Sequence, residues 1–149
     1  MIELGTADGS IRNAALPDAL AISRLITELG YSTTAPAMVN RLGPILSDPK
    51  YLTLVAASTT EIIGVAGATL ARYYEKDGVY CRLVLLVVAS SARGHGVGRA
   101  LVGAVEQWGA AHAAREMYVN SGLHRGQTHE FYERLGYRRT GWRFVRELG

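Results

Sequence analysis

Apolar and polar positions along the chain follow two patterns that alternate. In some segments apolar residues recur every three to four positions, which is typical of helices buried on one face, and in others β-branched and aromatic residues form short runs between turn residues. The helical spacing predicts helices over residues 17–29, 37–47, 97–113 and 127–135. The strand pattern predicts strands over residues 10–14, 51–57, 62–70, 79–88, 116–120 and 138–148.

The predicted elements follow one another in the order β-α-α-β-β-β-α-β-α-β, with no linker and no internal repeat. This order is typical of an α/β domain built around one mixed sheet. A chain of 149 residues is near the commonest size of a single domain. We therefore expect a short leader at residues 1–9 and one domain over residues 10–149. Gly43 and Pro44 predict a kink or an early break in the second helix.

Residues 79–88 form the most hydrophobic segment of the chain. A strand that is apolar on both faces belongs in the middle of a sheet. The single cysteine, Cys81, lies in this segment, and a free buried thiol suits a reducing compartment. Glu3 and Asp8 stand where a secretory signal would carry basic residues, and no apolar run is long enough to cross a bilayer. We expect a cytoplasmic protein with no membrane attachment.

A glycine-rich segment connects this strand to the third predicted helix, and residues 93–98 have the sequence Arg-Gly-His-Gly-Val-Gly. Backbone N–H groups at a helix N-terminus have no partner within the helix and attract anions. Glycines allow a phosphate to approach the backbone closely, and Arg93 adds a charged donor. The segment is therefore a candidate phosphate-binding loop, the plainer alternative being a tight strand-to-helix turn.

Two other phosphate-binding motifs are disfavoured by the residues that follow the glycines. A P-loop requires Gly-Lys-Ser or Gly-Lys-Thr, whereas Arg99 and Ala100 follow Gly98. A dinucleotide-binding Gly-x-Gly-x-x-Gly motif requires a third glycine where the chain has Arg99 or Leu101. The residues after the glycines thus disfavour nucleoside triphosphate hydrolysis and dinucleotide binding by this loop.

Three segments carry a resemblance to a known family. They are residues 86–101, the opening strand before Asp18, and a second block at residues 129–137 with the sequence His-Glu-Phe-Tyr-Glu-Arg-Leu-Gly-Tyr. Over residues 10–148 the chain resembles the GNAT superfamily of N-acetyltransferases. The resemblance implies a mixed central sheet of about six to seven strands flanked by about four helices, with acetyl-CoA as the cofactor. It also implies a homodimer.

The resemblance assigns the cofactor site to two stretches of backbone. The backbone of three residues at the end of the central strand would bind the pantetheine arm, and the N–H groups of the loop would bind the pyrophosphate. The predicted cofactor-binding residues are Leu86, Val87, Val88, Arg93, Gly94, His95, Gly96, Val97, Gly98, Arg99, Arg125, His129 and Phe131. Arg125 departs from the family pattern, because many members have an asparagine seven residues before the tyrosine of the second block.

Tyr132 in the second block is implied to be the catalytic general acid. A thiolate leaving group with a pKa near 8.5 gains from a phenol that donates a proton. The plainer alternative is an aromatic residue that caps the core. Transfer of the acetyl group to the primary amine of a small molecule by direct attack is the predicted reaction. The alternatives are a non-catalytic acyl-CoA sensor and acetylation of a protein N-terminus or lysine.

The acceptor side of the site is predicted less specifically. Many family members have a carboxylate on the strand before the loop, but residues 83–86 here are Leu-Val-Leu-Leu. The general base is therefore open, and water or a carboxylate elsewhere could remove the proton from the amine. The candidate substrate residues, on the loops that the resemblance places over the acceptor, are Tyr31, Tyr73 and Tyr74. The carboxylates that could serve as the base are Glu28 and Glu75.

The charge of the chain changes this picture in one respect. The formal net charge is +3, and 14 of the 16 basic residues are arginines. The pattern from Ser121 to Tyr132, with Trp142 to Phe144, resembles a subgroup that includes aminoalkylphosphonate N-acetyltransferases, so an anionic small amine is a possible acceptor. The arginines near the C-terminus fall on different strand faces, so nucleic-acid binding is not expected. His124 and His129 do not have metal-ligand spacing, so no metal site is expected.

Overall fold

The structure is a computed structural model, and it describes residues 2–3, 9–120 and 126–149. By its contacts the chain forms two compact units, Met1–Tyr118 and Val119–Gly149. The first unit contains nearly the whole sheet and the three longest helices, and the second contains a short helix and the C-terminal segment.

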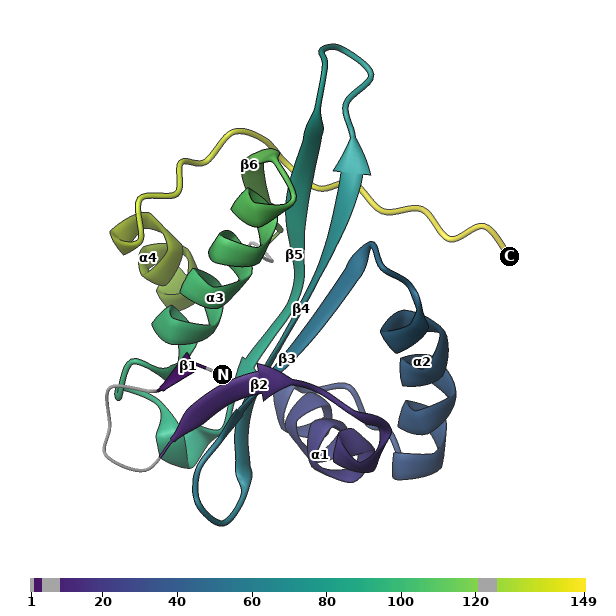
Figure 1. Cartoon of the computed structure of the whole chain (residues 1–149), viewed down its shortest axis with the longest axis vertical. Coiled ribbons are helices and arrows are strands. Elements are labelled where there is room, and N and C mark those ends of the chain that lie inside the picture. The colour runs from purple at the N-terminus through teal and green to yellow at the C-terminus, as the bar shows by residue number, and fades with distance from the viewer. Residues whose placement is uncertain (1, 4–8, 121–125) are drawn as a thin grey trace. The chain divides into compact units, whose positions relative to one another are not determined.

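The sheet has six strands among the described residues, in the order β1-β2-β3-β4-β5-β6 (Figure 1). The strands are β1 (Ile2–Glu3), β2 (Ser10–Asn13), β3 (Tyr51–Ala57), β4 (Ile62–Arg72), β5 (Val79–Val88) and β6 (Ala114–Val119). From β1 to β5 each strand pairs antiparallel with the next. A helix connects β5 to β6, which is the kind of crossover that parallel neighbours require. The predicted mixed α/β sheet is confirmed.

The helices of the first unit lie close to where the apolar spacing predicts them. They are α1 (Ala19–Leu29), α2 (Ala35–Ser47) and α3 (Val97–Ala111), with short 3-10 turns at Leu16–Asp18 and Ser90–Ala92. Gly30 ends α1 in the left-handed conformation, with φ 118°. The predicted early break at Pro44 is wrong, because α2 continues to Ser47. The Ser47 hydroxyl donates to the Gly43 carbonyl over 2.8 Å, so the last turn keeps an additional hydrogen bond.

The helices pack on both faces of the sheet. Val55, Val65 and Val87 join α1 and α2 in one buried cluster. Gly64, the residue before Val65, faces the other way, and a Cβ built on it would lie 3.0 Å from Leu101 of α3. Neighbouring residues of a strand point to opposite faces, so α1 and α2 cover one face and α3 covers the other. Beyond the cluster, β4 and β5 extend as a long hairpin (Figure 1).

The first strand was not predicted. Ile2–Glu3 lies in the segment expected to be a leader, yet it pairs with β2, with Ile2 opposite Ile11 and Glu3 opposite Ser10. A strand of two residues is too short for a period-2 pattern to be recognised in the sequence. The boundary between a leader and a domain at residues 9 and 10 stays a prediction.

The second unit contains α4 (Gly126–Arg134), which ends near Gly136 at φ 92°, close to the predicted helix over residues 127–135. The predicted final strand over residues 138–148 is wrong, because that segment has no regular secondary structure. Its alternating apolar side chains, such as Trp142 and Phe144, are largely exposed. An extended segment without a paired neighbour leaves its backbone N–H and C=O groups without protein partners and its apolar side chains unburied. An alternating pattern alone therefore overpredicts strands.

Candidate active site

The glycine-rich loop has the geometry of an open helix N-terminus. β5 ends at Val88, and α3 begins nine residues later at Val97. Gly94 and Gly96 both have φ 82°, a left-handed conformation that L side chains rarely adopt. A Cβ built on either glycine would meet nothing within 4 Å, so it would project into open space beside the loop. A ligand can approach the backbone there.

The first residues of α3 carry backbone donors that the helix itself does not pair. The Ala100 N–H donates to the Gly96 carbonyl over 3.0 Å, which is the first turn of α3. The N–H groups of the residues before Ala100 have no acceptor within the helix. Residues 93–96 are exposed, so the start of the helix is accessible to solvent. Free N–H groups and the positive end of the helix dipole together favour an anion such as a phosphate.

Side chains fix the segment between β5 and the glycines. Nε of Arg93 donates to the Val88 carbonyl over 3.1 Å, so the guanidinium folds back on the end of the strand. The Ser90 N–H donates to Oε1 of Glu28, at the end of α1, over 2.6 Å. This bond, with the nearby charge of Arg93, lowers the pKa of the Glu28 carboxyl. The loop is therefore tied to both α1 and β5.

Gly64 explains how α3 comes close to the sheet beside the loop. A Cβ at this position would lie 3.0 Å from Cδ1 of Leu101 and 3.2 Å from Cγ1 of Val97. Both contacts are shorter than normal, so a larger residue would push the first turn of α3 away from the strand. Because Val97 and Leu101 are buried, the N-terminus of α3 is held at a fixed height above β4 and β5.

The three residues predicted to bind the pantetheine arm end β5. Leu86, Val87 and Val88 lie opposite Ala66, Val65 and Gly64 of β4. On the other side, the rings of Tyr80 and Tyr118 are 4.9 Å apart between centroids, and β6 ends one residue after Tyr118. β6, the neighbouring strand on this side, therefore ends beside the first half of β5. The register of β5 also shifts between Leu83 and Leu85, which places a bulge at Val84.

A cluster of side chains lies at the opposite end of β5. We call it the hairpin cluster, and it consists of Tyr73, Lys76, Glu116 and Tyr118. Oε1 of Glu116 accepts from the Tyr73 hydroxyl at 2.6 Å, from Nζ of Lys76 at 2.9 Å and from the Tyr118 hydroxyl at 3.2 Å. These bonds, that from Lys76 first, lower the pKa of Glu116 to about 2. Desolvation and Glu116 raise the pKa of Tyr73. The cluster ties the β4–β5 hairpin to β6.

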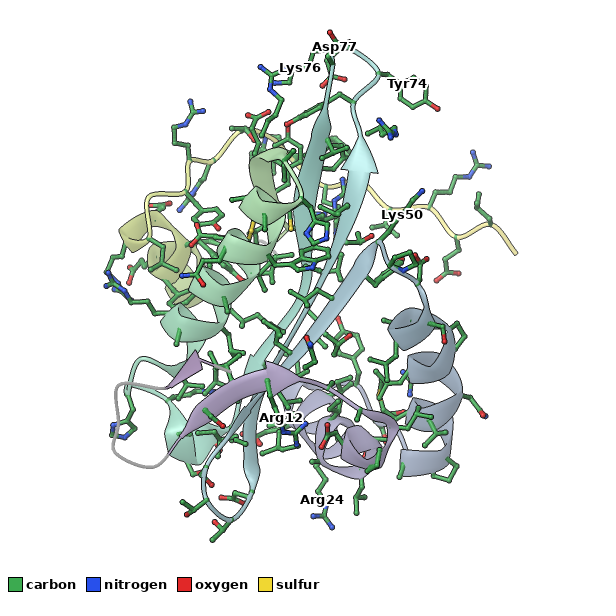
Figure 2. All side chains as sticks on the ribbon, viewed as in Figure 1. Arg12, Arg24, Lys50, Tyr74, Lys76 and Asp77 are labelled. Atoms are coloured by element: carbon green, nitrogen blue, oxygen red, sulfur yellow. The ribbon has the colours of Figure 1, made fainter. Side chains whose placement is uncertain are left out.

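The five candidate substrate residues fall into two groups that the structure does not bring together. Glu28 lies beside Ser90, and Tyr31 is exposed in the turn after α1. Tyr73, Tyr74 and Glu75 belong to the hairpin tip, and Figure 2 shows Tyr74 pointing outward from that tip. Ten residues of β5 separate the tip from the loop, roughly 30 Å of strand at about 3.3 Å per residue. One small acceptor cannot touch both groups.

Residues 129–134 of the second block lie on α4 and residues 135–137 follow it, all in the second unit. Tyr132 and Phe131 are half-buried neighbours with ring centroids 5.1 Å apart, and the Tyr132 ring is 5.8 Å from that of Tyr137. The Tyr137 N–H donates to the Tyr132 carbonyl over 3.0 Å, which caps the helix. His129 is half-buried on the same helix. Arg125 lies outside the described residues.

Arg82 was missed by the sequence analysis. Its Nε is buried and has no hydrogen-bond partner among the described residues. A charged residue inside the otherwise apolar run of residues 79–88 was the signal that could have found it. Cys81, its neighbour, is buried under α3, and burial raises the pKa of its thiol to about 11. Cys81 therefore stays a neutral thiol and is no nucleophile.

Within residues 2–3, 9–120 and 126–149, histidine, cysteine, aspartate and glutamate side chains form no group of three that could hold a metal ion. No helix in that part of the chain is long and apolar enough to cross a membrane.

Comparison with known proteins identifies the class to which this arrangement belongs. The sequence profile of the acetyltransferase (GNAT) family matches residues 19–137. The chain therefore belongs to the GNAT family of acyl-CoA-dependent N-acetyltransferases. No curated protein sequence matches the chain at a significant level.

Solved structures share the fold over almost the whole chain. A GNAT family acetyltransferase from Staphylococcus aureus has 24% identity and a TM-score of 0.81, covering 95% of this chain and 99% of its own. Glucosamine-6-phosphate N-acetyltransferase from Arabidopsis thaliana has 17% identity and a TM-score of 0.82, covering 95% and 99%. AAC(6')-Iy, in complex with the bisubstrate analog CoA-S-monomethyl-acetylneamine, has 20% identity and a TM-score of 0.83, covering 96% and 99%. At these identities the likeness establishes the fold.

Proposed function

We propose that the chain transfers the acetyl group of acetyl-CoA to the primary amine of a small molecule, with the pyrophosphate at the start of α3. The observation that carries this proposal is the pair of left-handed glycines, Gly94 and Gly96, that open the helix to solvent directly after β5. Acetyl-CoA supplies an activated thioester. The backbone N–H groups of residues 95–99 bind its pyrophosphate, and Arg93 adds charge at the edge of the loop.

The end of β5 positions the reactive end of the cofactor. The backbone of Leu86, Val87 and Val88 binds the pantetheine arm as an added strand would, and the early end of β6 favours this. Direct attack forms a bond between the amine nitrogen and the acetyl carbon and breaks the carbon–sulfur bond. Tyr132 donates its proton to the departing sulfur, a role taken from the family resemblance, and water accepts the proton of the amine.

Similar folds support a small amine as the acceptor. The names of two of the similar structures refer to glucosamine 6-phosphate and to an acetylated aminoglycoside, and both are small amino compounds. The predicted homodimer, the cytoplasmic location and the contacts of His129, Phe131 and Arg125 with the cofactor stay predictions. Light scattering at micromolar protein tests the dimer, and a monomer mass would contradict it.

The proposal is tested by two measurements on the same protein. Calorimetry follows acetyl-CoA binding, and a thiol reagent follows release of CoA across aminoalkylphosphonates, amino acids, polyamines and aminoglycosides. Release that depends on an amine supports a transferase. Tight binding without release with any amine favours the acyl-CoA sensor or a protein acceptor, and no binding contradicts the proposal.

Tyr132→Phe tests the proton donor. Loss of a general acid lowers kcat by about 10²- to 10⁴-fold, whereas the dissociation constant for acetyl-CoA should stay within about threefold. Tyr137→Phe is the matched control, because it removes a hydroxyl from a neighbouring ring on the same unit. A Tyr132→Phe enzyme with kcat within about twofold of wild type would exclude Tyr132 as the acid.

A further inference from the structure

Arg93 folds back onto the strand that precedes it. The 3-10 turn Ser90–Ala92 follows the end of β5, and Arg93 leaves that turn with an extended backbone, at φ −68° and ψ 151°. In this conformation Nε of Arg93 donates to the Val88 carbonyl over 3.1 Å. The guanidinium is charged at any physiological pH. No ion pair among the described residues includes Arg93, so its charge remains available to an anion.

The sheet register shows that the Val88 carbonyl points to the open edge of β5. In an antiparallel pair the backbone groups of successive residues point alternately toward one neighbouring strand and toward the other. The Ala89 N–H donates to the Ile63 carbonyl over 2.8 Å, so the backbone groups of Ala89 point toward β4. Those of Val88 therefore point the other way, to the side on which β6 ends early. Arg93 thus occupies an acceptor on the edge to which a further strand would add.

Glu28 favours this position of Arg93. Its Oε1 accepts the Ser90 N–H over 2.6 Å, which keeps the carboxylate beside the turn that leads to Arg93. The bond from Ser90 and the positive charge of Arg93 both lower the pKa of Glu28, so the two charges attract each other without a direct ion pair. Such an attraction between exposed charges is weak. Arg93 can therefore leave the strand when a stronger partner is present.

The two parts of the proposed cofactor site require different positions of Arg93. A pantetheine arm that adds to the edge of β5 needs the outward backbone groups of Leu86 and Val88, and Arg93 already occupies the Val88 carbonyl. A pyrophosphate at the start of α3 offers the guanidinium a charged acceptor. A hydrogen bond between two charged groups is about twice as strong as one between neutral groups. The pyrophosphate can therefore compensate for the bond to Val88 that is lost.

We propose that Arg93 makes the site selective for acyl donors that carry a pyrophosphate. In the free protein its guanidinium occupies the Val88 carbonyl and so covers part of the edge that binds the pantetheine arm. A donor with a pyrophosphate gives the guanidinium a stronger partner, whereas a short thioester displaces it without compensation. A ligand shifts such an equilibrium only by its different affinity for the two states. This inference rests on the proposed function, and it adds how the protein distinguishes acyl-CoA from smaller thioesters.

S-acetylpantetheine tests the inference, because it has the thioester and the pantetheine arm of acetyl-CoA but no pyrophosphate. Its binding is measured by ligand-observed NMR titration, which reaches millimolar dissociation constants, and acetyl-CoA binding is measured by calorimetry. Arg93→Ala frees the Val88 carbonyl, so S-acetylpantetheine should bind about 3- to 10-fold more tightly than to wild type. Acetyl-CoA should bind about 3- to 30-fold more weakly, because the variant lacks the charged donor for the phosphate.

Arg93→Lys separates the two roles of the guanidinium. A lysine keeps the positive charge but lacks a donor at the position of Nε, the atom that holds the Val88 carbonyl. S-acetylpantetheine should therefore gain most of the affinity that it gains in Arg93→Ala, while acetyl-CoA should lose less. Arg24→Ala is the matched control, because Arg24 is an exposed arginine of α1 away from the glycine-rich loop. It should leave both dissociation constants within about twofold of wild type.

The outcomes separate this inference from the proposed function. Opposite shifts for the two ligands in Arg93→Ala support the inference. It is overturned if Arg93→Ala binds S-acetylpantetheine no more tightly than wild type does, or if neither protein binds it, because the guanidinium then does not cover the edge. A gain for both ligands also overturns it, because Arg93 then makes no contact with the pyrophosphate. Failure of wild-type protein to bind acetyl-CoA contradicts the proposed function, whereas acetyl-CoA binding without the gain for S-acetylpantetheine contradicts the inference alone.

Discussion

The two ends of β5 differ in whether the hydrogen-bond donors around them are already paired within the protein. At the Val88 end, backbone donors at the start of α3 remain open, and glycines keep side chains away from them. At the Val79 end, the hairpin cluster closes on itself, since Glu116 takes three donors from the hairpin and β6. An end prepared for a ligand leaves donors unsatisfied, whereas an end that holds strands together satisfies them within the protein.

The largest effect is expected from a substitution that blocks the backbone N–H groups at the Val88 end of β5, the open end. Gly96→Val places a β-branched residue at φ 82° and fills the space beside the N–H groups. Losing about two hydrogen bonds to a charged phosphate should raise the dissociation constant for acetyl-CoA at least about 100-fold in calorimetry. Gly103→Ala is the control, because Gly103 lies in α3 with nothing within 4 Å of an added Cβ. An unchanged affinity in Gly96→Val would exclude the loop as the pyrophosphate site.

An intermediate effect is expected at low pH for the hairpin cluster, which forms the closed end of β5. The folded-state pKa of Glu116 is about 2, below its ordinary value of 4.5, so its stabilising contribution is complete above about pH 4.5 and is lost as the pH falls toward 2. Glu116→Gln should lower Tm near pH 7 and flatten the decline of Tm between pH 4.5 and 2, with acetyl-CoA affinity unchanged.

Glu75→Gln is the control for this experiment, because it removes a carboxylate from the same hairpin outside the hairpin cluster. It should keep the wild-type dependence of Tm on pH. If Glu116→Gln also keeps that dependence, the hairpin cluster does not stabilise the fold through the charge of Glu116.

The smallest effect is expected at Glu28. Its carboxylate accepts the Ser90 N–H, and its lowered pKa makes it a weaker base. Glu28→Gln keeps an acceptor for that N–H, so kcat should stay within about threefold of wild type, whereas loss of a general base would cost about 100-fold or more. A loss of that larger size in the turnover assay would assign the base to Glu28 and revise the role given to water.

Much of the open end was predictable because its signals are local. The position of the glycines after an apolar strand predicted the start of α3, and Gly96 does cap that helix. The apolar spacing likewise predicted α1, α2 and α4 within a few residues. The final strand was not predictable in this way, because an alternating segment becomes a strand only when a neighbour pairs with it.

The contacts at the closed end could not be predicted from the sequence. Tyr73 was expected to contact a substrate, but the fold brings it to Glu116, 43 residues later in the chain. Nothing near Tyr73 in the sequence indicates that pairing, because it depends on the crossover through α3 that places β6 beside β5. Arg82 is marked in the sequence as the charged residue of an apolar run, but its register opposite Thr69 and the burial of its Nε come from the fold.

The sequence by itself determined the order of helices and most strands, the helix-capping loop and the resemblance to acetyltransferases, since each depends on residues close together in the chain. The fold decided which carboxylate is already paired, which arginine has a buried Nε without a hydrogen-bond partner, and that the predicted substrate residues lie at opposite ends of β5. Those properties depend on long-range contacts and on desolvation, which arise only when distant segments pack together.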